Sequence, residues 1–154
     1  MKKQKGFSLI ELLIVVAIIL IIAAIAIPNL IKSKMAANES SAVGSLRSIT
    51  TAEIAFSTAC PALGFTGVLA DLGTPGNAAC AGGANQIDNL LSGGTKSGYK
   101  MTLAAPGATP VTTFTVNANP VSASSGTRYF FVDQTGVIRY NQAAAAAVTD
   151  PPLQ

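Results

Sequence analysis

The sequence predicts an α+β fold, in which one long amino-terminal α-helix packs on a small antiparallel β-sheet. Three observations carry this prediction. An unbroken apolar run extends from Leu12 to Ile27, and an amphipathic helical pattern continues to about Ala59. Apolar and polar residues then alternate in several runs between Tyr99 and Tyr140, as they do in strands. Such strands can bury their apolar face against the amphipathic part of the helix.

The amino-terminal half of the helix is predicted to cross a membrane. Counted from Phe7, its apolar run has about the 20 residues that a helix needs to span the hydrocarbon core of a bilayer. Its one charge, Glu11, costs at least a few kcal/mol in lipid unless it is paired. Cleavage between Gly6 and Phe7 would create an α-amino group about one helical turn before Glu11. In an array of identical helices, that amine could pair with Glu11 of a neighbour and set the axial register.

A short motif lies between the Lys-rich start and the apolar run, and it reads Gly6-Phe7-Ser8-Leu9-Ile10-Glu11. Together with Pro28 after the run, it resembles the class III signal of type IV pilins and of the related pseudopilins of type II secretion. The resemblance implies that a prepilin peptidase removes the leader, residues 1–6, by cutting after Gly6, and then methylates the new amino terminus at Phe7. It also implies subunit docking through Phe7 and Glu11, and a helix kink at Pro28.

Two other interpretations of this region remain open. One is an ordinary secretory signal, with Ala24-Ile25-Ala26 as its cleavage site. Glu11 would then lie inside the apolar region, which is also longer than the usual length of roughly 7 to 15 residues. The other is a plain membrane anchor with its basic flank in the cytoplasm. This second interpretation partly agrees with the resemblance, because pilin precursors wait in the inner membrane before assembly.

The net charge gives no argument for a nucleic-acid-binding protein. The 154-residue chain has ten Lys and Arg and seven Asp and Glu. Three of the basic residues, Lys2, Lys3 and Lys5, belong to the leader, so the mature chain has seven side chains of each sign. A neutral chain lacks the basic excess that marks a nucleic-acid surface.

The composition also argues against an enzyme. There is no histidine, which excludes His-based catalytic triads, His-ligated haem and His-containing zinc sites. Asp71, Asp88 and Asp133 are scattered, without the spacing of a metal site. We therefore expect no catalytic residues, no cofactor and no metal.

The second half of the helix, residues 28–59, is predicted to be amphipathic. Pro28 lacks an amide hydrogen and its ring clashes with the preceding turn, so it should kink or locally open a helix of roughly 80 Å. An arc of about 160° gathers the larger apolar residues, namely Ile31, Met35, Ala42, Val43, Leu46, Ile49, Ile54 and Phe56. Polar residues interrupt this side at Lys32, Asn38, Glu39, Thr50 and Glu53. We expect from them that the early turns are not deeply buried in the monomer.

Residues 60–98 are predicted to form a connecting loop that contains a disulfide. Cys60-Pro61 ends the helix, because proline disfavours helical geometry in the residue before it. Cys60 and Cys80 should pair in a domain that the leader delivers outside the cytoplasm, stabilising it by roughly 3 kcal/mol. Ile87, Leu90 and Leu91 are expected to form a short helical turn or a strand.

Residues 99–140 are predicted to form three or four antiparallel strands. The alternating runs are Tyr99–Ala104, Thr113–Asn117, Arg128–Val132 and Val137–Tyr140. Asp133-Gln134-Thr135-Gly136 is a hairpin signal, with Gly136 in the left-handed region and Asp133 stabilising the turn. The tail, residues 141–154, is expected to be a loose edge segment or disordered.

The resemblance implies a structural subunit of a type IV pilus, polymerising through helices 7–27 into a surface fibre for motility, adhesion or DNA uptake. Its partners would be copies of itself, the inner membrane, the prepilin peptidase, and the assembly platform and motor of the pilus. The alternative is a pseudopilin of type II secretion, and a different class is a monomeric membrane-anchored binding domain. DNA could contact a basic patch on one sheet edge, formed by Lys96, Lys100, Arg128 and Arg139.

Overall fold

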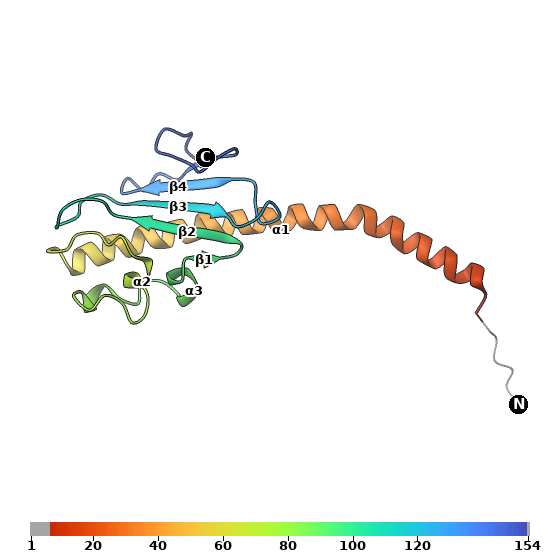
Figure 1. Cartoon of the computed structure of the whole chain (residues 1–154), viewed down its shortest axis with the longest axis horizontal. Coiled ribbons are helices and arrows are strands. Elements are labelled where there is room, and N and C mark those ends of the chain that lie inside the picture. Colours follow the sequence, from red (N-terminus) through yellow and green to blue (C-terminus); the bar gives the residue numbers. More distant parts are fainter. Residues whose placement is uncertain (1–6, 154) are drawn as a thin grey trace, which may run out of the picture. The chain divides into compact units, whose positions relative to one another are not determined.

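The computed structural model describes residues 7–153, and it contains one long helix and a five-stranded antiparallel sheet (Figure 1). The predicted α+β fold is confirmed. The chain divides into two compact units, with the boundary after Lys34. The amino-terminal unit contains the first part of helix α1, and the carboxy-terminal unit contains the rest of α1 together with the sheet.

Helix α1 extends over Leu9–Ala59, 51 residues, and ends directly before Cys60-Pro61 as expected. It passes through Pro28 in helical geometry. Because proline has no N–H, the carbonyl of Ala24 lacks its usual donor four residues later. The kink at Pro28 stays a prediction.

Within residues 35–59, which we call the docked segment, one stripe of α1 is buried. Leu46, Ile49 and Phe56 are at most 1% exposed. One expectation about this stripe is wrong. Ile54 is 53% exposed, because it lies about 100° around the helix from Glu53, which faces the core. Glu39 and Glu53 are buried, because groups of the carboxy-terminal unit donate hydrogen bonds to both.

The sheet is a meander in which every neighbouring pair is antiparallel. Its strands are β1 (Thr95–Lys96), β2 (Tyr99–Ala104), β3 (Thr115–Pro120), β4 (Tyr129–Asp133) and β5 (Arg139–Asn141). Figure 1 shows β2, β3 and β4 along the docked segment. One face of these strands joins the α1 stripe in the core, with Met101, Leu103, Val116, Ala118, Phe130 and Val132.

The predicted hairpin connects β4 to β5. Gly136 has a φ of +76°, and its N–H donates to the carbonyl of Asp133 at 2.9 Å. The Asp133 carboxylate accepts the Thr135 N–H at 2.9 Å, which confirms its role in the turn. Of the two alternatives for the tail, its described part is an edge segment: the Leu153 N–H donates to Ile138 O at 2.7 Å.

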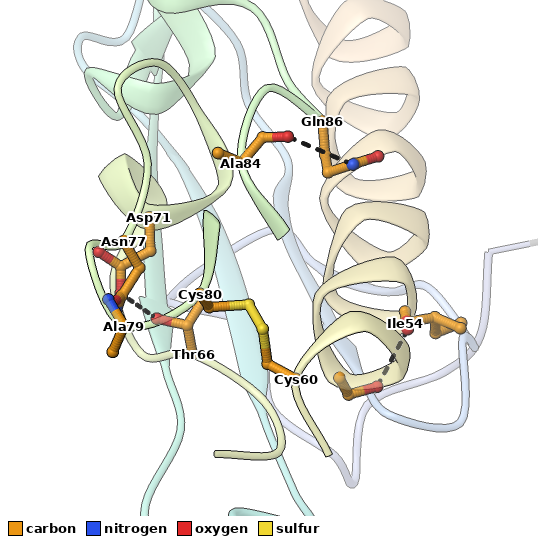
Figure 2. The surroundings of a disulfide bond; sticks show 10 residues. Ile54, Cys60, Thr66, Asp71, Asn77, Ala79, Cys80, Ala84 and Gln86 are labelled. Carbon is orange, nitrogen blue, oxygen red and sulfur yellow. Dashed lines mark hydrogen bonds between the residues drawn. A yellow bond between two sulfur atoms is a disulfide. The ribbon is translucent and has the colours of Figure 1, made fainter. Parts of the chain in front are cut away.

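The chain between α1 and the sheet is less irregular than a plain loop. It contains α2 (Leu69–Leu72), the 3₁₀ turn η1 (Ala81–Gly83) and α3 (Asn89–Ser92), so Leu90 and Leu91 form a helical turn. The predicted disulfide between Cys60 and Cys80 is confirmed (Figure 2). A side chain at Gly83 would collide with the Phe56 ring and the Cys80 sulfur, so η1 packs closely on the helix.

Candidate functional site

The candidate site comprises the first turns of α1 and the two residues before the helix. We call residues 7–27 the apolar segment; at about 1.5 Å per residue it is about 30 Å long. By length and composition α1 has a stretch able to cross a membrane, and none of that stretch is buried among residues 7–153. Its exposed large side chains are Phe7, Leu9, Ile10, Leu12, Leu13, Ile14, Val15, Val16, Ile18, Ile19, Leu20, Ile21, Ile22, Ile25 and Ile27.

These side chains point in every direction around the helix. A helix of a soluble domain has an apolar stripe and a polar face, whereas a helix that is apolar all round is normally buried. Exposed apolar surface of this extent marks contact with lipid or with another protein. The apolar segment is therefore a surface that needs a cover from outside the chain.

Glu11 and Phe7 both lie at the start of α1. The Glu11 Oε2 atom accepts a hydrogen bond from the backbone N–H of Ser8 at 3.0 Å. Phe7, the residue before Ser8, is 79% exposed. A glutamate that reaches back three residues to the N–H before the first turn is half of a capping box. The contact with Ser8 was not predicted, although the Ser-x-x-Glu spacing is a local signal for it.

This geometry gives Glu11 two chemical possibilities. One oxygen satisfies a backbone donor at the helix start, where the partial positive charge of the helix dipole also favours a carboxylate. The carboxylate remains able to accept a further hydrogen bond from outside the chain, because the residue is exposed. Gly6, the predicted cleavage position, and the basic residues Lys2, Lys3 and Lys5 lie outside the described residues.

Glu39 connects the beginning of the docked segment to the two residues that precede β4. Its Oε1 accepts the N–H groups of Thr127 at 2.9 Å and of Arg128 at 3.2 Å, and its Oε2 accepts Arg128 Nε at 2.8 Å. Burial alone would raise the pKa of Glu39, but the hydrogen bonds from Thr127 and Arg128 and the guanidinium charge hold this pKa below its usual value. Glu39 is therefore an ionised anchor between α1 and the chain entering β4.

The basic patch expected on one sheet edge is not formed. Lys96 is in β1 and Arg139 is in β5, which are opposite edges of the sheet. Lys96 forms an ion pair with Asp88 at 2.7 Å, and Arg128 pairs with Glu39. The prediction of one basic edge is wrong because alternation along a chain does not reveal the order of strands.

The three scattered aspartates each have a local partner. Asp88 accepts the N–H groups of Leu90 and Leu91 at the start of α3, and Asp133 stabilises its turn. Asp71 accepts hydrogen bonds from Thr66 Oγ1 and Asn77 Nδ2. Among residues 7–153, no three His, Cys, Asp or Glu side chains gather where they could hold a metal ion.

Comparison with known proteins places the similarity in the amino-terminal region. Residues 1–27 match the family described as the prokaryotic N-terminal methylation motif. The chain is 52% identical over 54 residues to the type IV major pilin protein PilA of Myxococcus xanthus, covering 35% of this chain and 24% of that protein. It is 59% identical over 39 residues to the type IV wide pilus major component PilA4 of Thermus thermophilus, covering 25% of this chain and 30% of that protein.

The chain thus matches less than a third of the length of either relative. No solved structure matches. The resemblance to type IV pilins that the first 28 residues predicted is confirmed, and the chain carries the methylation motif.

Proposed function

We propose that this chain, whose amino-terminal segment is that of a type IV pilin, is a structural subunit of a type IV pilus. The observation that carries the proposal is the apolar segment, exposed all round and continuous with a folded carboxy-terminal unit. In the precursor, lipid would surround this segment. In the filament, the same segment of other copies would surround it. Each would remove the exposed apolar surface from water.

Processing would precede assembly. A prepilin peptidase would cut between Gly6 and Phe7 in the inner membrane and methylate the new amino group of Phe7. The motif match over residues 1–27 supports this step. Phe7 is exposed and lies two residues before the first residue of α1, which suits access by such an enzyme.

Glu11 would then dock the subunit. In the filament its carboxylate would accept a hydrogen bond from the Phe7 amine of a neighbouring copy, while Oε2 keeps its hydrogen bond from the Ser8 N–H. Pairing in an apolar surrounding reduces the cost of an isolated buried charge. The helix kink at Pro28 would adjust the direction of α1 between the filament core and the carboxy-terminal unit.

The functions of the fibre would depend on its exposed loops and on the assembly platform and motor, and they would include motility, adhesion or DNA uptake. The subunit would act structurally rather than as an enzyme. Its location would be the inner membrane as a precursor and the cell surface after assembly.

Glu11→Gln tests the docking step separately from the helix cap. Glutamine can still accept the Ser8 N–H, as glutamate does in a capping box, but it carries no charge. We expect Glu11→Gln to be processed and inserted normally. The amount of subunit in fibres sheared off cells should fall at least about tenfold, as we also expect for Glu11→Ala. Ser8→Ala keeps the backbone N–H that Glu11 accepts, so it is the control for a neutral substitution at the helix start and should assemble. Normal fibres from Glu11→Gln would mean that Glu11 acts only as a cap.

Mass spectrometry of the sheared material tests the role itself. A peptide that begins at methylated Phe7 in the sheared fraction is the expected result. The same peptide found only in the envelope would favour the pseudopilin alternative. A mature chain that begins at Ile27 would contradict the proposal.

A further inference from the structure

Glu53 is a buried carboxyl group that forms no ion pair with any residue the structure describes. It lies in the docked segment with 0% of its surface exposed. Its Oε2 accepts the backbone N–H of Thr66 at 3.0 Å, whereas its Oε1 is buried and has no hydrogen-bond partner in the described part of the chain. Unpaired buried oxygens are costly, and an ionised one is far more costly than a neutral carboxylic acid.

The segment that covers Glu53 belongs to the disulfide loop, which we define as residues 61–79 between the two cysteines. Thr66 both donates its N–H to Glu53 and donates its hydroxyl to Asp71 at 2.6 Å. Asn77 Nδ2 also donates to Asp71, at 2.8 Å. Figure 2 shows Thr66, Asp71 and Asn77 gathered beside the disulfide. The loop thus brings a second carboxylate toward Glu53.

The sheet side supplies no compensating charge. The inward side chains of β2, β3 and β4 around the docked segment are apolar, apart from Tyr99. Tyr99 donates its hydroxyl to Arg128 O and lies in the field of Glu39 and Arg128. Asp133 shares a strand face with Phe131, opposite the core face of β4. The two ion pairs among residues 7–153 involve Asp88 and Glu39, not Glu53.

We propose that the protonation state of Glu53 controls whether the disulfide loop stays packed on α1. With the proton on Glu53, a neutral carboxylic acid accepts the Thr66 N–H and the loop stays packed on α1. When that proton leaves to solvent, a buried carboxylate faces Asp71 with one oxygen unsatisfied. The loop then moves away from α1 far enough for water to reach Glu53, while the Cys60–Cys80 bond keeps both ends of the loop attached.

In the packed form, Glu53 exchanges its proton near neutral pH. Burial raises the pKa of Glu53 from its usual 4.5 to about 7; the Thr66 hydrogen bond lowers it, and the Asp71 charge raises it further. Since the packed form holds its proton more tightly than the open form, the packed form loses stability as pH rises from about 4.5 to about 7. Each pH unit in that window changes the packed-to-open ratio about tenfold, or a few hundredfold in all.

Hydrogen exchange of the full chain in detergent, from pH 5 to pH 8, tests this proposal. With intrinsic exchange rates divided out, protection of the peptide covering residues 61–72 should fall by at least about tenfold over this range. Glu53→Gln, which copies the neutral form, should keep its protection constant. Glu39→Gln is the matched control and should show the same pH dependence as the parent. Equal pH dependence in the parent and Glu53→Gln would overturn the proposal.

Two further measurements keep the test decisive if Glu53→Gln does not fold. Asp71→Asn removes the neighbouring negative charge, so the loss of protection should move to lower pH. Carboxyl ¹³C NMR of the parent should show one glutamate titrating near neutral pH, assigned to Glu53. A Glu53 carboxyl that remains ionised from pH 5 to pH 8 would overturn the proposal, as would an unshifted Asp71→Asn.

Discussion

The two parts of helix α1 carry similar apolar side chains in opposite surroundings. In the apolar segment Ile18 is 52% exposed and Ile21 is 63% exposed, whereas in the docked segment Leu46 and Ile49 are 0% exposed. The docked segment is covered by the chain's own sheet, whereas the membrane-length stretch of the apolar segment is not buried by any of residues 7–153. Substitutions in the apolar segment should therefore change assembly, and substitutions in the docked segment should change folding.

The largest effect is expected for Ile18→Lys. A lysine at the centre of a membrane-spanning helix costs about 2.5 to 3.5 kcal/mol and would repeat in every subunit of a fibre. We expect sheared fibres to disappear while the near-UV circular dichroism and melting temperature of the carboxy-terminal unit remain those of the parent. A lower melting temperature would mean that the two segments are not independent, and would break the comparison.

Leu46→Ala is the reciprocal change in the docked segment. It removes a fully buried side chain from the core and should lower the free energy of unfolding by about 2 to 5 kcal/mol. Ile54→Ala, at a position 53% exposed, is the matched control and should cost less than about 1 kcal/mol. Denaturant unfolding of the full chain in detergent measures both. Equal losses would mean that the buried stripe is assigned wrongly.

Cys60→Ser tests the loop that adjoins the docked segment. The disulfide joins residues 20 positions apart and should contribute about 3 kcal/mol under oxidising conditions by reducing the entropy of the unfolded chain. Under reducing conditions the parent and Cys60→Ser should be about equally stable. A parent that is no more stable than Cys60→Ser when oxidised would contradict the expected contribution of the bond.

Glu39→Gln should have the smallest effect, because the partner Arg128 is partly exposed. Loss of the charged hydrogen bonds should cost about 1 to 2 kcal/mol at neutral pH. Since the pKa of Glu39 is lowered by folding, this stabilisation is present above the usual glutamate pKa and disappears as pH falls through the lowered value. The difference in unfolding free energy between the parent and Glu39→Gln should therefore be present at pH 7 and shrink as pH falls toward 3.

The sequence predicted the elements that depend on local signals. Helical periodicity and Cys60-Pro61 predicted the end of α1 at Ala59. The alternation of apolar and polar residues predicted the strand Tyr99–Ala104, and Gly136 predicted the turn. The burial of Glu39 and Glu53 could not be predicted, because their partners lie far along the chain. Arg128 is 89 residues from Glu39, and Thr66 is 13 residues from Glu53. A charge on a helix is therefore ambiguous until the fold brings its partner near.

The candidate site divides in the same way. Phe7, Glu11 and the apolar run are local features of the sequence, and their place at the helix start follows from a few adjacent residues. The partner proposed for Glu11 would be on another subunit, which no pattern within one chain can locate. The Ser8 contact is local too, because Ser-x-x-Glu at the start of a helix is the spacing of a capping box.

The tail pairs with β5, and this pairing affects how copies of the carboxy-terminal unit behave at high local concentration. Pro152 bridges to Arg139, and the Tyr140 N–H donates to Pro151 O at 3.2 Å. An open strand edge invites pairing with strands of other molecules, whereas this outer edge is already occupied by residues that include two prolines, which offer no N–H. The opposite edge is the two-residue strand β1. Copies of the carboxy-terminal unit can therefore be held at high local concentration with little tendency to join by strand addition, the first step of amyloid-like aggregation.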